Sequence, residues 1–380
     1  MFAPIRSMLS VRRGAPVALI VGAASVSFLF GATPFLIPEV ADRLDVSLGV
    51  AGLISSAQVL GFAGSVFVAG RRLTPSRGVL VWAAVAAAAF DVASGFVPSF
   101  GLLLVLRLGA GVAAGLLTWL AWADAMRSSH SMRDIAAVGP LAVLFGAPLL
   151  GWVASVGGDR ALYLVLAASM IPPMLIPVEF VAQPMRGRHS MSPSRTNLVL
   201  MGALGFLTMA GSALFVFLGA FADIEVGLTA VALSLGFSVN ALAGLIAARL
   251  RRRPRYAWPW LVVTAVSATS IVLFPGPVVF YAGMFSWGFA FWMAVPRVLG
   301  RVAEWSLVPD ERVGDAQSIM ALGRAAGPAI GAALVGSGEF GGLVAFAGAG
   351  LLSSAVLAGS VEVYRRDRAG PSAGHNVPHR

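Results

Sequence analysis

The chain has 380 residues, of which 58% are hydrophobic and 12% are charged, whereas about 25% are charged in an ordinary soluble domain. With a mean hydropathy of +0.85, this composition excludes a soluble enzyme and indicates a polytopic α-helical membrane protein. All 27 basic residues are arginine and cysteine is absent, which excludes disulfides, cysteine-ligated metals and lysine Schiff-base chemistry.

Twelve apolar segments are long enough, at about 20 residues each, to cross a ~30 Å hydrocarbon core as helices. The first follows Arg6, Arg12 and Arg13, but its length and the lack of a small-residue cleavage site predict an uncleaved span rather than a signal peptide. The predicted spans, in chain order, are 15–37, 50–69, 79–97, 100–123, 135–156, 160–180, 197–221, 228–248, 257–275, 278–300, 316–336 and 341–362.

The distribution of arginine predicts the orientation in the membrane. Of the 27 arginines, 22 lie before the first span, in the loops after every second span, or in the C-terminal tail. The opposite loops contain only Arg43 and Arg160, together with seven acidic residues. Because arginine-rich loops stay in the cytoplasm, both termini are predicted to be cytoplasmic in a multi-pass protein of the cell membrane. The basic charge therefore requires no nucleic-acid partner.

A polar connection divides six spans from six. It predicts an N-terminal bundle of residues 1–182, a cytoplasmic linker of residues 183–196, a C-terminal bundle of residues 197–364 and a cytoplasmic tail of residues 365–380. A shift of 180 residues relates the halves, since Asp45–Arg72 aligns with Glu225–Arg252 without gaps. Parallel six-helix repeats about an axis along the membrane normal are typical of one large transporter fold, with its substrate site between the halves.

With twelve spans, a duplication and a central linker, the chain resembles the major facilitator superfamily over nearly its whole length. Local patterns support the resemblance. The loop after the second span, Gly70 to Gly78, keeps basic residues of the family's G-x3-D-R-x-G-R-R loop but lacks its acid, and the fourth span contains the R-x3-G-x3-G pattern. The fifth and eleventh spans contain forms of the exporter-associated G-P-x-x-G-G pattern. The motif residues, to which the resemblance assigns gating or structural roles, are Arg71, Arg72, Arg77, Arg107, Gly111, Gly115, Pro148, Gly151, Pro328 and Gly331.

Two charges lie in neighbouring spans, where a charge is costly. Asp91 and Arg107 are each eight residues from Ser99, so both are expected about 12 Å from the same end of their helices. An unpaired charge at a helix centre costs roughly 2.5–3.5 kcal/mol, so such groups pair or face water. We predict an ion pair in which Asp91 is a protonatable carboxylate and the proton is the coupling ion. A static structural bridge, or two side chains that face different directions, is the alternative.

Other polar and aromatic residues within spans are candidates for a substrate cavity. With Arg107, they are Gln58, Trp119, Asn240, Trp287 and Arg297. Interhelical hydrogen bonds are the alternative for the two amides, and packing or lipid contact is the alternative for the tryptophans.

Arg297 and Arg324 lie at nearly equal distances from Pro309–Asp310 and are expected at comparable depth. There they would attract an anion, or hold an inner gate through Glu304, Asp310, Glu311 or Asp315. Snorkelling to the membrane surface is the alternative.

No catalytic, nucleotide-binding or metal-binding motif is present in the sequence, and the four histidines lie in loops or the tail. We therefore predict a monomeric secondary transporter that uses no cofactor, acts on a small molecule in the lipid bilayer and works by alternating access. The leading hypothesis, from the similarity of residues Gly31 to Gly64 to drug and metabolite exporters, is proton-coupled export of a small organic molecule. Uptake of an organic anion and a non-transporting membrane sensor with the same fold are the alternatives.

Overall fold

A computed structural model describes residues 15–125, 129–180, 192–250, 254–307, 309–335 and 340–369. Most of the predicted linker, residues 183–191, and residues 370–380 of the predicted tail lie outside the described residues. The helices are α2 (Val17–Gly31), α3 (Thr33–Leu44), α4 (Leu48–Arg72), α5 (Arg77–Phe96), α6 (Phe100–Ala125), α7 (Ser129–Ser169), α8 (Ile171–Leu175), α9 (Arg195–Ile224), α10 (Ala230–Arg249), α11 (Trp258–Leu273), α12 (Pro277–Glu304), α13 (Pro309–Val335) and α14 (Gly341–Ala369).

Nine helices in the described ranges are long and apolar enough to cross a membrane, and the bent pair α2–α3 makes a tenth. Helix α7 consists of two helices that meet at Gly158, where a φ of 62° breaks the helical backbone. Helix α11 is apolar but has only 16 residues. If α7 is counted as two spans and α11 as one, the described helices account for all twelve predicted segments.

The first predicted span differs from the structure. Helix α2 ends at Gly31, and the chain bends by 48° into α3, which continues to Leu44. Pro34 lies in the first turn of α3, where a proline costs no backbone hydrogen bond, so the bend needs no break in pairing. The expectation of a loop from residue 38 to residue 49 was therefore wrong, because most of that segment is helical.

Polar caps set the start of four helices. In each, a serine or threonine hydroxyl accepts a hydrogen bond from the backbone N–H three residues later, which satisfies one of the free donors of the first turn. The pairs are Ser47 with Val50, Ser76 with Val79, Ser194 with Asn197 and Thr229 with Ala232. These helices begin within two residues of the predicted spans.

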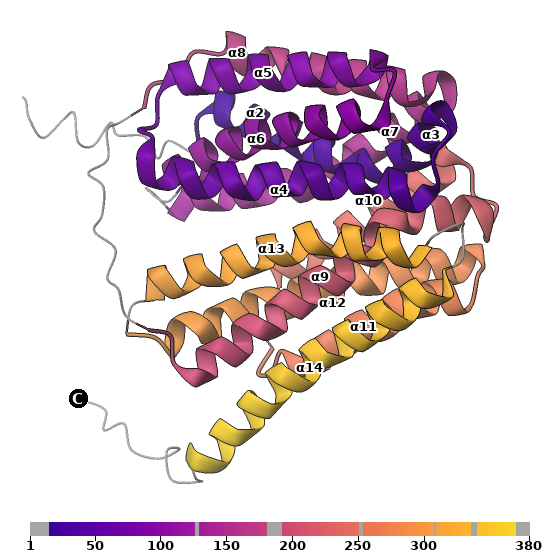
Figure 1. Cartoon of the computed structure of the whole chain (residues 1–380). Helices are drawn as coiled ribbons and strands as arrows, with labels where there is room; N and C mark the ends of the chain where they lie inside the picture. Colours follow the sequence, from indigo (N-terminus) through magenta and orange to yellow (C-terminus); the bar gives the residue numbers. More distant parts are fainter. Residues whose placement is uncertain are drawn as a thin grey trace, which may run out of the picture.

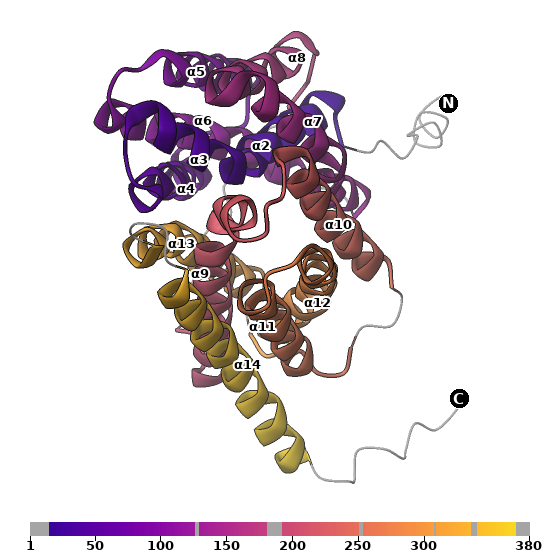
Figure 2. The same ribbon diagram turned by 90° about the vertical axis from the view of Figure 1, so that its right-hand side faces the viewer.

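The helices form two groups, α2–α8 and α9–α14, which lie one above the other in Figures 1 and 2. The groups meet mainly through α4 with α13, α7 with α10, and α3 with α9. The shift of 180 residues relates α4 to α10 and the first half of α7 to α13. The shift therefore relates the contact of α4 with α13 to the contact of α10 with α7, as expected for halves related by a pseudo-two-fold axis.

The two ends of the helices differ in charge. At one end, which we call the arginine-rich end, α4 finishes with Arg71 and Arg72, and α5 begins at Arg77. At the other, the acidic end, Asp45 precedes α4 and Glu225 follows α9. Helix α3 marks the acidic end in Figure 1.

Contacts between the two groups gather toward the acidic end. The ring of Phe217 on α9 lies where a side chain on Gly52 of α4 or on Gly331 of α13 would be, so three helices meet at this ring. Gly219 of α9 lies against the backbone carbonyl of Pro34 on α3. In Figure 1 the ribbons of α4 and α13 approach each other toward this end. The two groups are thus packed together where α4 begins.

Helix α10 makes a second set of contacts with the N-terminal group. Its Phe237 packs edge-to-face on Phe35 of α3, with ring centroids 5.7 Å apart. Its Ser238 hydroxyl donates to the Leu144 carbonyl of α7 at 2.8 Å. Gly151 of α7 lies so close to α10 that a Cβ would be 2.6 Å from the Ala230 carbonyl oxygen. The glycine of the fifth-span motif is therefore a point of close helix approach.

Helices α4 and α6 are joined along a seam of three glycines. At each, a Cβ would collide with a backbone carbonyl oxygen of the facing helix. Small residues allow such close backbone approach in membrane helices. The facing pairs are Gly61 with Leu108, Gly111 with Gln58, and Gly115 with Phe62.

We expect Gly111→Ala to destabilise the fold. The added methyl group would collide with the Gln58 carbonyl and force α4 and α6 apart, and overpacking of this kind costs typically about 1–3 kcal/mol. The melting temperature of the detergent-solubilised protein measures the effect. Gly101→Ala is the matched control on the same helix, since no atom lies within 4 Å of its added carbon. Equal melting temperatures for the two variants would contradict the seam.

Candidate functional site

The structure brings Asp91 of α5 and Arg107 of α6 together. The Arg107 Nη2 donates to Asp91 Oδ1 at 2.7 Å, and neither side chain has any accessible surface. The antiparallel helices are joined by a turn of three residues, which places the two groups at one depth as the spacing predicted. The predicted ion pair is confirmed, whereas its role in proton coupling stays a prediction.

Arg107 is held by several groups besides Asp91. The Ser94 hydroxyl oxygen accepts from its Nε at 3.1 Å and from its Nη2 at 2.8 Å. The Gln58 Oε1 accepts from Nη1 at 3.4 Å, and the Tyr163 ring lies 4.8 Å from the guanidinium carbon. Four helices, α4 to α7, thus surround the cation. This explains how a fully buried arginine is accommodated, because a buried charge needs both a counter-ion and hydrogen bonds.

Three polar atoms next to this arginine remain unpaired. Asp91 Oδ2, Gln58 Nε2 and the Tyr163 hydroxyl are buried and have no hydrogen-bond partner among the described residues. Each unsatisfied buried group costs about 1–3 kcal/mol, so native structures keep few of them and often keep them for function. The cluster of Gln58, Asp91, Arg107 and Tyr163 therefore has free hydrogen-bonding capacity that a fully satisfied structural bridge would lack.

A second ion pair lies nearer the acidic end. Arg43 of α3 donates through Nε to Asp159, which follows the break in α7 at Gly158. Its Nη1 and Nη2 donate to the carbonyls of Val97 and Ser94 at 2.9 and 3.1 Å. Ser94 thus contacts Arg107 through its side chain and Arg43 through its backbone. The two charge pairs are linked through one residue of α5.

The sequence interpretation missed Ser94, Tyr163 and the pairing of Arg43 with Asp159. Ser94 was within reach, because a residue three positions after Asp91 lies on the same face of a helix. Tyr163 and Arg43 carry no such signal. Their positions depend on the break at Gly158 and on the extension of α3 to Leu44.

Two of the predicted cavity residues contact neighbouring helices. Asn240 on α10 donates through Nδ2 to the Met284 carbonyl of α12 at 2.8 Å, so it makes the interhelical hydrogen bond that was the alternative. Trp287 is only 5% exposed and packs edge-to-face on Phe215 at 5.6 Å between ring centroids. Trp119 is half-buried, with its indole nitrogen next to Gly70.

The expected equal depth of Arg297 and Arg324 was wrong. Helix α13 begins at Pro309 rather than near residue 316, so Arg324 lies 15 residues into its helix, whereas Arg297 lies only seven residues before the end of α12 at Glu304. Arg297 pairs with Glu304 at 3.4 Å, and Arg301 pairs with the same carboxylate at 2.9 Å. Glu304 is one of the acids expected for an inner gate. Arg324 is separated from this cluster.

The motif residues occupy the places that the spans predict. Arg71, Arg72 and Arg77 are exposed at the arginine-rich end, and none of them forms an ion pair with a described residue. Pro148 lies within α7 and Pro328 within α13. The glycine three residues after each proline faces another helix, as the contacts of Gly151 and Gly331 show.

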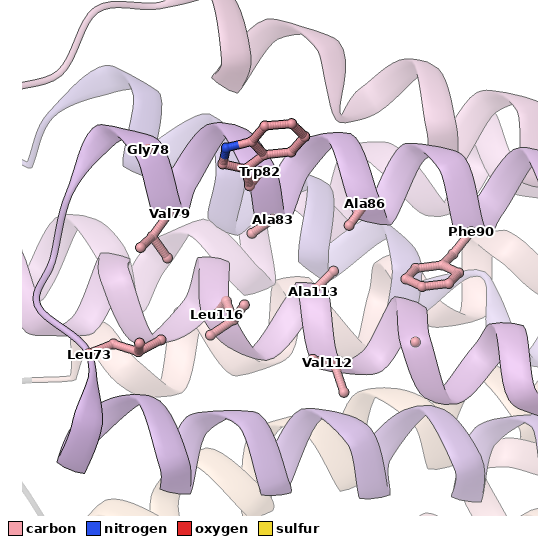
Figure 3. Close-up of a pocket in the computed structure, with 11 residues that line it drawn as sticks. Leu73, Gly78, Val79, Trp82, Ala83, Ala86, Phe90, Val112, Ala113 and Leu116 are labelled. Atoms are coloured by element: carbon pink, nitrogen blue, oxygen red, sulfur yellow. The ribbon is translucent and has the colours of Figure 1, made fainter.

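A groove of about 490 Å³ lies between α5 and α6. Figure 3 shows Trp82, Ala86 and Phe90 on one wall and Val112 and Leu116 on the other. Trp82 is 73% exposed, and none of the described lining residues is charged. An apolar groove on the outer surface of membrane helices suits lipid chains. It contains neither member of the ion pair, which lies on the inner side of the same helices. Among the described residues, no group of three or more His, Cys, Asp or Glu side chains could hold a metal ion.

Comparison with known proteins identifies relatives by sequence and by fold. No protein-family model matches the sequence. An uncharacterised MFS-type transporter of Bacillus subtilis (strain 168), YceJ, is 27% identical over 344 residues, which cover 82% of this chain and 87% of the relative.

Solved structures match the fold at lower identity. A bacterial homologue of the human lysosomal transporter Spinster, in an inward-facing and occupied conformation, has a TM-score of 0.71 at 14% identity and covers 96% of this chain and 97% of its own. The nucleoside transporter NupG has a TM-score of 0.67 at 13% identity over 91% of this chain and 98% of its own. The human organic anion transporter MFSD10 has a TM-score of 0.64 at 18% identity over 91% of this chain and 97% of its own. The predicted all-helical polytopic fold is confirmed, and the chain has the fold of these solved transporters.

Proposed function

We propose that this protein is a secondary transporter of the major facilitator superfamily, that it exports a small organic molecule in exchange for protons, and that Asp91 carries the proton. The observation that supports this proposal is the buried pair of Asp91 and Arg107, whose carboxylate keeps its Oδ2 without a partner among the described residues. A carboxylate in which one oxygen holds a cation and the other is free can accept a proton without first breaking a hydrogen bond.

Protonation of Asp91 would change the net charge of the cluster of Gln58, Asp91, Arg107 and Tyr163. The charge on Arg107 would lose its only anionic partner among the described residues, and its remaining acceptors, such as Ser94 and Gln58, are neutral. An uncompensated buried charge costs several kcal/mol. Since a shift between two conformations from 1:99 to 99:1 requires about 5.5 kcal/mol, a change of this size is sufficient to bias alternating access.

The arrangement of charge supports a cytoplasmic position for the arginine-rich end, and hence for both termini. The contacts between the groups, such as Phe35 with Phe237 and Gly219 with Pro34, would then close the external side. The bacterial Spinster homologue of similar fold is described as inward-facing and occupied. We infer that this structure of the chain corresponds to an inward-facing state.

Proteoliposomes that contain the full chain and a pH-sensitive dye test the proposal. A panel of organic anions, cations and neutral compounds is added with an imposed pH gradient. Proton movement that depends on one of these compounds supports proton-coupled export. Uptake of an anion without proton movement would overturn it in favour of an importer. No movement of any compound, by protein that is correctly inserted, would overturn it in favour of a sensor with the same fold.

A further inference from the structure

Arg324 is a charged residue near the centre of a membrane-spanning helix. Helix α13 runs from Pro309 to Val335, and Arg324 lies about 22 Å along it at 1.5 Å per residue. Its side chain is exposed, and it forms no ion pair or hydrogen bond with any other residue that the structure describes. In this it is the opposite of Arg107, which is fully buried and paired.

Exposure changes along the face of α13 that carries Arg324. Residues spaced by three, four and seven positions share one face of a helix. On this face Gln317 and Arg324 are exposed and Ala321 is half-buried, whereas Met320 and, nearer the acidic end, Pro328, Gly331 and Val335 are buried. Because Gly331 lies against the ring at which α4, α9 and α13 meet, the buried part of this face is the part packed against other helices. Arg324 lies where this packing ends.

A different face of α13 is exposed along most of its length. It contains Leu322, Ala326, Ala329 and Ala333, of which Leu322 is 60% exposed, Ala326 and Ala333 are exposed and Ala329 is half-buried. These side chains are apolar, as expected for a surface in contact with lipid. Arg324 is two positions from Leu322 and therefore points in nearly the opposite direction.

Helix α4 shows the same change on the face that it turns toward α13. The face is buried near the acidic end, half-buried in the middle and exposed near the arginine-rich end. The residues, in this order, are Gly52, Ser55 and Val59; Ala63 and Val66; and Gly70. The facing sides of α4 and α13 thus both become more exposed toward the arginine-rich end.

Arg324 is accessible and yet lies midway along α13, on the side of the helix opposite the apolar exposed face. A side chain with both properties lines an opening between helices rather than the outer surface. Within a span, a cation without a partner is expected to face water or a ligand, because a charge at the helix centre is costly in lipid. A guanidinium binds carboxylate and phosphate groups through two parallel hydrogen bonds.

We propose that Arg324 binds an oxyanion of the transported molecule, a carboxylate or a phosphate, in the opening between α4 and α13. This inference rests on the proposed transport function and adds a substrate class to it. The molecule would enter from the arginine-rich end, and its anionic group would lie against α13 at the depth where the two helices begin to pack. The substrate would serve as the counter-ion that the described residues do not provide.

The absence of cysteine makes the first part of this proposal directly testable. In Arg324→Cys the introduced thiol is the only one in the chain. A water-soluble, charged methanethiosulfonate reagent is expected to label it in the membrane. Leu322→Cys is the matched control, which the same reagent is expected to leave unlabelled because lipid covers that face. Labelling of Leu322→Cys but not of Arg324→Cys, or equal labelling of both, would overturn the proposal.

Anion binding is tested with Ala321→Cys, which places a thiol one turn from Arg324 on a half-buried position. Benzoate and phenyl phosphate are the probes, and neutral benzamide is the control. An anion at about ten times its Kd is expected to slow labelling roughly tenfold. The slowing is expected to disappear when Arg324→Gln is added and to persist with Arg324→Lys. The two anions distinguish a carboxylate site from a phosphate site. Labelling that no anion slows, or that anions slow equally with Arg324→Gln, would overturn the proposal.

The labelling rate does not depend on proton movement. Protection by anions without proton-coupled transport would therefore reject the proposed function and keep the anion site. Proton-coupled transport without protection by anions would reject the anion site and keep the proposed function.

Discussion

Replacement of Asp91 by asparagine is expected to abolish substrate-dependent proton movement. Asparagine has nearly the same shape and its oxygen accepts from Arg107 as Oδ1 does, but it does not bind a proton in the range in which carboxylates titrate. Proton uptake by proteoliposomes is expected to fall to the level of liposomes without protein. A counterflow assay, in which substrate exchanges for substrate without proton movement, is expected to retain activity.

Two further variants keep this prediction decisive. Asp91→Asn leaves the Arg107 charge buried without a counter-ion, so the double variant Asp91→Asn with Arg107→Gln restores a neutral pair if the single variant is unstable. Ser94→Ala removes two hydrogen bonds from the same arginine but no titratable group, and it is expected to keep proton coupling. Proton-driven transport by a folded Asp91→Asn protein at the native rate would remove Asp91 from the mechanism.

Replacement of Arg107 by leucine is expected to have the largest effect on stability of any single arginine substitution in the described helices. It leaves the Asp91 carboxylate buried without a cation and removes the donors to Ser94 and Gln58. Removing one partner of a buried pair costs about 3–5 kcal/mol. The melting temperature in detergent and the fraction of monodisperse protein measure this loss.

Arg301→Ala is the matched control for this effect. Arg301 also forms an ion pair, at 2.9 Å with Glu304, but the two side chains are 23% and 49% exposed. An exposed pair contributes about 0–1 kcal/mol, so the control is expected to keep its melting temperature. The double variant Asp91→Leu with Arg107→Leu is expected to recover most of the stability but not transport. Equal destabilisation by Arg107→Leu and Arg301→Ala would contradict the energetic importance of burial.

Most of the fold was predictable, because lipid allows only continuous apolar helices across a membrane and so makes each span visible in the sequence. Ends with a polar cap, such as those at Ser47 and Ser76, were predicted within two residues. The start of α13 was not, since the segment from Pro309 carries the polar residues of a helix that begins before the apolar run. The bend between α2 and α3 was not predicted either; it lies next to a close contact of Pro34 with Gly219 of α9, which is distant in the sequence.

The central pair of the site was predictable for two physical reasons. A hairpin of antiparallel helices fixes relative depth, and the cost of a lone charge in lipid favours pairing. The rotation of each helix was not available from spacing alone, so only the structure excluded the alternative that Asp91 and Arg107 face different directions. Arg297 and Arg324 show the limit of the same argument. The midpoint of the connection was taken as Pro309–Asp310, whereas the connection lies between Glu304 and Pro309. The predicted depths of the two arginines were therefore wrong.

The glycine seam between α4 and α6 limits which parts of the protein can move. Sliding one helix along the other would drive the carbonyls of Gln58 and Leu108 out of the spaces that Gly111 and Gly61 leave for them. The two helices therefore travel as one rigid unit and carry Arg107, a residue of α6, with them. In the proposed transport cycle, the contacts that separate and re-form are those between the groups, including the hydrogen bond from Ser238 to Leu144.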